Sequence, residues 1–147
     1  MTHPATKSVS AILTIAGAAP FILLLSPHLP LADAVLPDHE TAFLTYGAII
    51  AAFMAGALWG LSQTASNVPI AQLVVSNILA LVAWASLLLP RSYLHASLAI
   101  QLASFLGLLA ADLNLRKAGL EASWYIKLRL SVTAIVAAAY CAAFLYL

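Results

Sequence analysis

Charged residues are scarce in this chain of 147 residues, since only 7% are Asp, Glu, Lys or Arg. A typical soluble domain has about a quarter. Six Lys and Arg residues stand against five Asp and Glu residues, so the net charge is +1. Such a chain lacks the charged surface of a soluble enzyme and the basic face that a nucleic-acid-binding protein needs. The scarcity of charge therefore excludes both classes.

Cysteine and catalytic motifs are scarce as well. The single cysteine, Cys141, excludes an intrachain disulfide and a cysteine-based metal cluster. The sequence contains no nucleophile elbow, phosphate-binding loop or haem attachment motif. Five residues of metal-binding type precede the second hydrophobic run, at a spacing that fits no standard site: His28, Asp33, Asp38, His39 and Glu40. We therefore expect no enzyme activity, no metal and no cofactor.

Long hydrophobic runs dominate what remains. Hydrophobic residues make up 64% of the chain and form five runs, each close to the roughly 20 residues that a helix needs to cross a bilayer. The runs are apolar on every face, whereas the strands of a membrane barrel would alternate. The expected spans are residues 8–25, 41–61, 70–89, 94–113 and 125–147. We predict an all-α integral membrane protein, a bundle of five transmembrane helices with short loops, forming one domain over residues 1–147. Pro20 is expected to bend the first helix at most.

The positions of Lys and Arg predict the orientation of this bundle. If the N-terminus is cytoplasmic, Arg91 is the only cation on the outer side. The inner side then holds Lys7, Arg116, Lys117, Lys127 and Arg129. Because inner loops are enriched in Lys and Arg, we predict a cytoplasmic N-terminus and an outer C-terminus. The expected location is the bacterial inner (cytoplasmic) membrane.

Small residues recur every four positions along the second span. This small-residue ridge consists of Ala48, Ala52, Gly56 and Gly60, with Trp59 close to the same face. Such ridges let helix backbones approach closely in lipid, where the hydrophobic effect does not drive helices together. The ridge therefore predicts a helix–helix contact. Packing inside the bundle is the usual reading, and packing against a partner chain is the alternative.

Polar side chains line one face of each of the last two spans. They are Ser97, Gln101, Ser104 and Asp112 in the fourth span, and Tyr125, Arg129, Thr133 and Tyr140 in the fifth. Ionisable groups inside a membrane are costly, so each is a candidate functional residue. A short loop joins the two spans, which are therefore expected to be antiparallel neighbours. We predict an ion pair between Asp112 and Arg129, which either locks the register of the two helices or handles protons or substrate.

Asn77 is the polar candidate in the third span. An asparagine in a membrane helix most often makes an interhelical hydrogen bond, worth about 0.6 kcal/mol. A ligand contact is the alternative, and Trp84 lies on the same helical face, seven residues later.

Two motifs in sequence order resemble a known family. They are Tyr46-Gly47-Ala48 with Phe53, Gly56 and Trp59-Gly60, and then Asp112 with Trp124-Tyr125, Leu128-Arg129 and Thr133. From Tyr46 onward the chain resembles the family of small bacterial membrane proteins that includes the mitochondrial transmembrane protein 69 of animals. The resemblance implies a five-helix fold and a membrane location, and it implies no established activity. It also marks the residues Gly56, Trp59, Gly60, Asp112 and Arg129.

Two functions from different classes remain. The first is a non-catalytic accessory or assembly subunit of a larger inner-membrane complex, respiratory or photosynthetic, which would contact other membrane subunits through a small-residue ridge. The alternative is a small bundle that binds or transports a hydrophobic molecule such as a quinone or lipid. In that case we expect Tyr46, Trp59 and Trp84 to line an apolar pocket. Asn77 or Gln101 would then orient the ligand.

Overall fold

The computed structural model describes residues 4–25, 38–64 and 68–147, and its regular elements there are all helical. They are α1 (Pro4–Ala16), α2 (Ala19–Leu24), α4 (His39–Thr64), α5 (Ile70–Ala85), the 3-10 helices η1 (Ser86–Leu88) and η2 (Arg91–Tyr93), α6 (Leu94–Lys117) and α7 (Ser123–Tyr146). Five segments are long and apolar enough to cross a membrane: Ala5–Leu24, His39–Gln63, Ile70–Leu88, Arg91–Lys117 and Ser123–Tyr146. The five predicted spans are therefore confirmed as helical segments, with ends that differ by a few residues.

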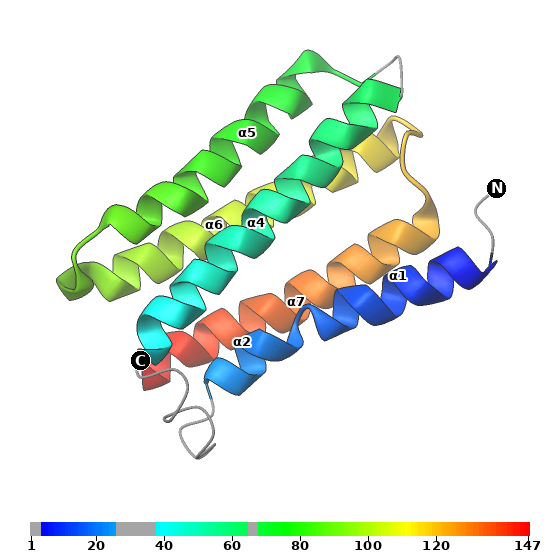
Figure 1. The fold of residues 1–147 in the computed structure, drawn as a ribbon. Helices are drawn as coiled ribbons and strands as arrows, with labels where there is room; N and C mark the ends of the chain where they lie inside the picture. Colours follow the sequence, from blue (N-terminus) through cyan, green and yellow to red (C-terminus); the bar gives the residue numbers. More distant parts are fainter. Residues whose placement is uncertain (1–3, 26–37, 65–67) are drawn as a thin grey trace.

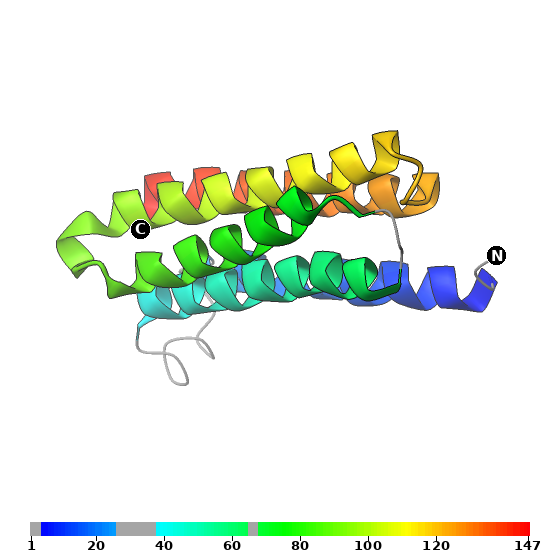
Figure 2. The same cartoon turned by 90° about the horizontal axis from the view of Figure 1, so that it is seen from above.

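The helices lie side by side, and the two ends of the chain emerge at opposite ends of the bundle (Figure 1). Helices α4, α5 and α6 pack against one another, and α7 packs against α6. The first span completes the bundle, with α2 against α4 and α7 and with α1 against α7. Seen from above, α6 and α7 form one layer, and α1 and α4 lie in another (Figure 2). An odd number of spans places the termini on opposite sides of any membrane that the bundle crosses.

The first span is interrupted, where the sequence predicts only a bend. Helix α1 ends at Ala16 and α2 begins at Ala19. Pro20 has no amide hydrogen for the carbonyl of Ala16, and its ring collides with that carbonyl in a regular helix. The backbone tightens instead, and the Ala18 amide donates to the carbonyl of Ile15 at 3.0 Å. The carbonyl of Gly17 accepts the hydroxyl of Tyr46 at 2.7 Å, so α4 supplies the partner for this break.

An aromatic cluster anchors α2 in the core. The ring centroid of Phe21 lies 5.4 Å from that of Phe43 and 5.8 Å from that of Tyr140. Phe105 adds a contact from α6, with its centroid 6.1 Å from Phe21. The pairs of Phe21 with Phe43 and Phe105 are edge-to-face, and such pairs contribute about 0.5–1.5 kcal/mol each beyond the burial of their area. Four helices thus meet around Phe21, which fixes the second half of the interrupted span.

Candidate functional site

Gln101 is the centre of a buried polar cluster in α6. Its Nε2 donates to the carbonyl of Leu44 and to Oγ of Ser86, each at 2.9 Å, and its Oε1 accepts the hydroxyl of Tyr140 at 2.6 Å. Ser97 donates to the carbonyl of Ser86 at 2.9 Å. Both amide hydrogens and the amide oxygen of Gln101 are therefore engaged. The cluster ties α4, α6, α7 and η1 together and leaves Gln101 no free donor for a ligand.

Asp112 and Arg129 form an ion pair between α6 and α7, through Oδ2 of the aspartate and Nε of the arginine. Both residues are buried, with 0% of Asp112 and 8% of Arg129 exposed. Among the residues described, Oδ1 of Asp112, Nη2 of Arg129 and Oγ1 of Thr133 are buried without a hydrogen-bond partner. The pair thus has the predicted partners, and its polar groups are only partly satisfied. Whether it serves as a lock or in handling a ligand stays a prediction.

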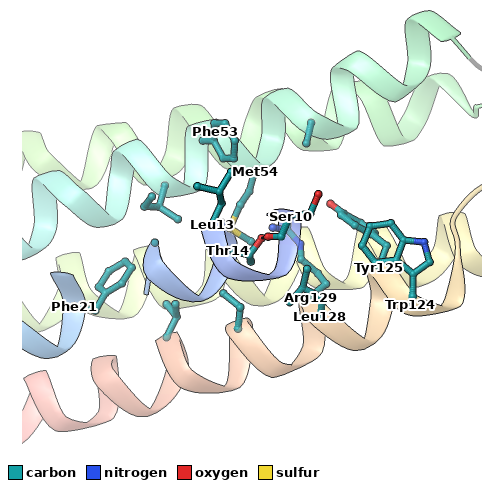
Figure 3. A pocket seen from close by; sticks show the side chains of 15 residues that line it. Ser10, Leu13, Thr14, Phe21, Phe53, Met54, Trp124, Tyr125, Leu128 and Arg129 are labelled. Carbon is teal, nitrogen blue, oxygen red and sulfur yellow. The ribbon is translucent and has the colours of Figure 1, made fainter. Parts of the chain in front are cut away.

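A pocket of about 510 Å³ lies between α1, α4 and α7, beside this ion pair (Figure 3). Most of its wall is apolar, with Leu13, Ile50, Met54, Val132 and Val136 among its lining residues. The break in the first span borders it, because Gly17 and Phe21 also line the wall. A cavity of this size falls within the roughly 300–1,000 Å³ typical of small-molecule sites.

The polar groups of the pocket gather toward one end. Figure 3 shows Trp124 and Tyr125 at that end, Phe21 at the other, and Arg129 between them beside Ser10. The ammonium of Lys7 lies 5.8 Å from the centre of the Trp124 ring, which adds a second cation nearby. The pocket therefore has an apolar body and one polar, cation-bearing end, which is the arrangement that an amphiphilic molecule requires.

Glu121, in the turn between α6 and α7, interacts electrostatically with the Asp112–Arg129 pair. Its Oε2 is buried without a hydrogen-bond partner among the described residues. Burial and the nearby charge of Asp112 raise the pKa of Glu121 to about 7, and the charge of Arg129 opposes that shift. Sequence reasoning missed Glu121. The available signal was an acidic residue in the short loop between two residues that were expected to pair.

The pocket beside the ion pair is not formed by the aromatic residues that the sequence suggests for a pocket. Trp59 and Trp84 are 51% and 54% exposed, and neither lines the pocket described above. The hydroxyl of Tyr46 donates a hydrogen bond to the carbonyl of Gly17, at the break in the first span. Asn77 is exposed and donates to the carbonyl of Leu73 in its own helix at 2.9 Å, so the expected interhelical bond is not formed by this donor. A short amide side chain easily reaches the carbonyl one turn back, which removes the need for a partner helix.

Most of the small-residue ridge of α4 does not pack inside the bundle, where such ridges usually lie. Ala48 is buried, but Ala52, Gly56 and Gly60 are exposed. A Cβ atom added to either glycine would meet nothing within 4 Å. Each four-residue step turns about 40° past a full turn, so the ridge rotates away from the bundle. The buried face of α4 follows mixed steps of three and four instead: Ala48, Ala51, Ala55 and Leu58.

Asp38, one of the residues of metal-binding type before the second span, has a structural role. Asp38 accepts the amide hydrogen of Thr41 at 3.1 Å, which caps the start of α4. It also pairs with Arg91. These hydrogen bonds and this charge lower the pKa of Asp38. The described residues hold no group of three or more potential metal ligands, and His28 and Asp33 lie outside them.

Comparison with curated proteins gives no match, and comparison with solved structures gives none either. The profile of one protein family, described as "Protein of unknown function (DUF3429)", matches residues 6–145. That range takes in nearly all of the five spans, the pocket and the Asp112–Arg129 pair. The chain belongs to this family of proteins of unknown function.

Proposed function

We propose that this chain is a small membrane bundle that binds a hydrophobic molecule, such as a quinone or a lipid, in the pocket between α1, α4 and α7. The observation that carries the proposal is the position of Arg129. It brings a guanidinium group to the wall of an otherwise largely apolar pocket. A mostly apolar pocket with a few polar groups at fixed positions is typical of small-molecule sites.

The interrupted first span supports the same proposal. Irregular backbone is tolerated at membrane depth where it is buried in protein or lines a cavity. Here Gly17, within the break, and Phe21, in the first turn of α2, line the pocket. The hydroxyl of Tyr46 and the aromatic cluster hold the break in one geometry. The pocket is therefore built on fixed elements, which lowers the entropy lost on binding.

The proposal is tested by purifying the native chain in mild detergent and analysing the bound molecules by mass spectrometry. Ala57 lines the pocket, so the variant Ala57→Phe should fill part of it and reduce the amount of bound molecule. The control is Ala52→Phe, on an exposed position of the same helix that does not line the pocket. An empty native chain, or equal loss in both variants, would overturn the proposal.

A second function, an accessory or assembly subunit of a larger respiratory or photosynthetic complex, is favoured by the exposed part of α4. Gly56 and Gly60 leave open space on a face that α5 and α6 do not cover. Trp59 is half exposed beside them. Such a face suits close packing of a helix from another subunit. The substitution Gly56→Leu should then lower the yield of a stoichiometric membrane partner, whereas Ala110→Leu, at an exposed position of α6, should not.

We further propose a bacterial inner-membrane location with the N-terminus in the cytoplasm. The support is the clustering of cations at one end of the bundle. Lys7 lies against Trp124 near the start of α7, and Arg116 and Lys117 lie in the last turn of α6. Arg91 lies at the other end of α6. Reporter tags at both termini test the orientation, and tags that report the same compartment would contradict it. We also propose, from the two sequence motifs, that the chain is related to the family that includes transmembrane protein 69.

A further inference from the structure

Two hydroxyl groups belong to side chains that line the pocket from different helices. Ser10 lies in α1, and Tyr125 lies in the first turn of α7. Figure 3 shows Ser10 beside Arg129 and Tyr125 at the end of the pocket that is remote from Phe21. The hydroxyl of Tyr125 is directed toward the middle of the pocket in the same view. The two hydroxyls therefore lie in the same half of one cavity.

Both hydroxyls are available to a bound molecule. Neither makes a hydrogen bond within the described part of the chain, whereas Thr14 donates to the carbonyl of Ser10 at 2.6 Å and Ser131 donates to the carbonyl of Lys127 at 3.0 Å. The oxygens of Ser10 and Tyr125 are also not among the fully buried atoms without a partner, and both residues are partly exposed. Each hydroxyl thus keeps its donor for a ligand.

The charges near the pocket are already in use. Among the described residues that line it, Arg129 is the only charged one, and 9% of its side chain is exposed. Its Nε donates to Asp112, so the two side chains together carry no net charge. Lys7 does not line the pocket, and its ammonium lies over the ring of Trp124. An ionised head group would lose its water here without gaining a free counterion, so the wall favours an uncharged head.

We propose, on the basis of the ligand-binding function above, that the pocket takes an uncharged, lipid-soluble molecule whose carbonyl group accepts hydrogen bonds from Ser10 and Tyr125. A carbonyl oxygen has two lone pairs and no hydrogen to donate, so it requires donors and places no demand on the rest of the wall. The apolar wall that runs toward Phe21 takes the tail of the molecule.

Two classes of membrane molecule carry this chemistry. A quinone has its carbonyl groups on a flat ring, and a neutral ester lipid has its carbonyl on a flexible chain. The flat ring fits the polar end better, because the aromatic rings of Trp124 and Tyr125 line it with their centroids 6.1 Å apart. Such rings pack well against another flat ring, edge to face or offset.

The test measures equilibrium binding of radiolabelled decylubiquinone to the full chain in phosphatidylcholine nanodiscs, with empty nanodiscs as the blank. The variants Ser10→Ala and Tyr125→Phe each remove one proposed donor. We expect each to weaken binding about two- to tenfold, the size that follows from one neutral hydrogen bond, and the double variant to weaken it further. Because neither hydroxyl has a partner in the described chain, both variants should unfold at the native temperature, which separates binding from folding.

Matched controls remove the same groups away from the pocket. Ser131 is exposed on α7, Tyr93 is exposed in η2, and neither lines the pocket. Ser131→Ala and Tyr93→Phe should therefore bind decylubiquinone with the native affinity. A loss in these controls that equals the loss in Ser10→Ala and Tyr125→Phe would overturn the assignment of the two donors.

Three further ligands define the head group in the native chain. Monoolein has an uncharged ester, and its binding in place of decylubiquinone would support the carbonyl and assign it to an ester lipid. Decylbenzene has no oxygen, and we expect it to bind at least several-fold more weakly than decylubiquinone. Decanesulfonate has a permanent charge, and we expect it to bind more weakly as well.

Three results would overturn the inference while a ligand still occupies the pocket. They are equal binding of decylbenzene, tighter binding of decanesulfonate, and an unchanged affinity for both carbonyl ligands in the double variant. Each of them leaves the proposed function intact. If none of the four ligands binds, this inference is wrong, and the proposed function is wrong as well only if the native chain also purifies empty.

Discussion

The hydroxyl of Tyr140 in α7 donates a hydrogen bond of 2.6 Å to Oε1 of Gln101 in α6, inside a fully buried part of the bundle. Helix α4 passes this bond at Gly47, where a side chain would collide with both polar atoms. The close approach of α4 also lets Nε2 of Gln101 reach the carbonyl of Leu44. One glycine therefore decides whether three helices can share a satisfied polar cluster.

The first prediction concerns that glycine. The substitution Gly47→Ala should destabilise the bundle by about 1–3 kcal/mol, because the new methyl group must displace the Tyr140 hydroxyl and the Gln101 amide. The measurement is the free energy of unfolding in mixed micelles. Gly56→Ala in the same helix is the matched control, since its methyl group meets open space and alanine is the better helix former by about 1 kcal/mol. Equal effects of the two substitutions would contradict the close approach at Gly47.

The second prediction separates the two partners of the buried hydrogen bond. Tyr140→Phe removes one donor and leaves Gln101 its two other bonds, so the expected loss is about 0.6 kcal/mol. Gln101→Leu leaves the Tyr140 hydroxyl, the Ser86 hydroxyl and the Leu44 carbonyl without this partner, so a larger loss of about 1–3 kcal/mol is expected. A double-mutant cycle measures the coupling. Strictly additive losses would show that the two side chains do not interact.

The third prediction compares the buried ion pair with an exposed one. Asp112→Asn should cost about 3–5 kcal/mol of unfolding free energy, because it leaves the charge of Arg129 buried without its counterion. Adding Arg129→Gln should recover part of that loss. Arg91→Gln breaks the exposed pair with Asp38 and should cost about 0–1 kcal/mol. If Asp112→Asn were as mild as Arg91→Gln, the guanidinium of Arg129 would have to be solvated.

The fourth prediction is a pH dependence of stability. The pKa of Glu121 rises from 4.5 to about 7 in the folded chain. Between these two values the folded chain binds more protons than the unfolded chain, so the free energy of unfolding decreases as the pH rises. Thermal unfolding from pH 5 to pH 8 should show this decrease, and Glu121→Gln should abolish it. A melting temperature that rises over this interval in the native chain but not in the variant would contradict the assignment.

Local sequence was sufficient to predict the helices and part of the candidate site. A long apolar run can satisfy its backbone hydrogen bonds in a membrane only as a helix or as a strand of a closed barrel. These runs do not alternate between polar and apolar residues, so the helix is the structure that remains. The pairing of Asp112 with Arg129 also followed from sequence, because a short loop forces antiparallel neighbours to bring residues near their shared end to one depth. The sequence predicts a bend near Gly17, whereas the structure has a break between α1 and α2 there. Its geometry depends on the hydroxyl of Tyr46, which is 29 residues away.

The order of residues is enough to predict five membrane-length helices, a polar face on each of α6 and α7, and a contact between Asp112 and Arg129. The buried face of α4 could not be predicted in this way, because a four-residue ridge drifts around the helix and the packing follows Ala51 and Ala55 instead. The pocket beside Arg129 likewise depends on tertiary packing, and neither Trp59 nor Trp84 lines it. A cavity forms where three helices fail to fill the space between them, and that depends on how their axes cross rather than on the residues of any one helix.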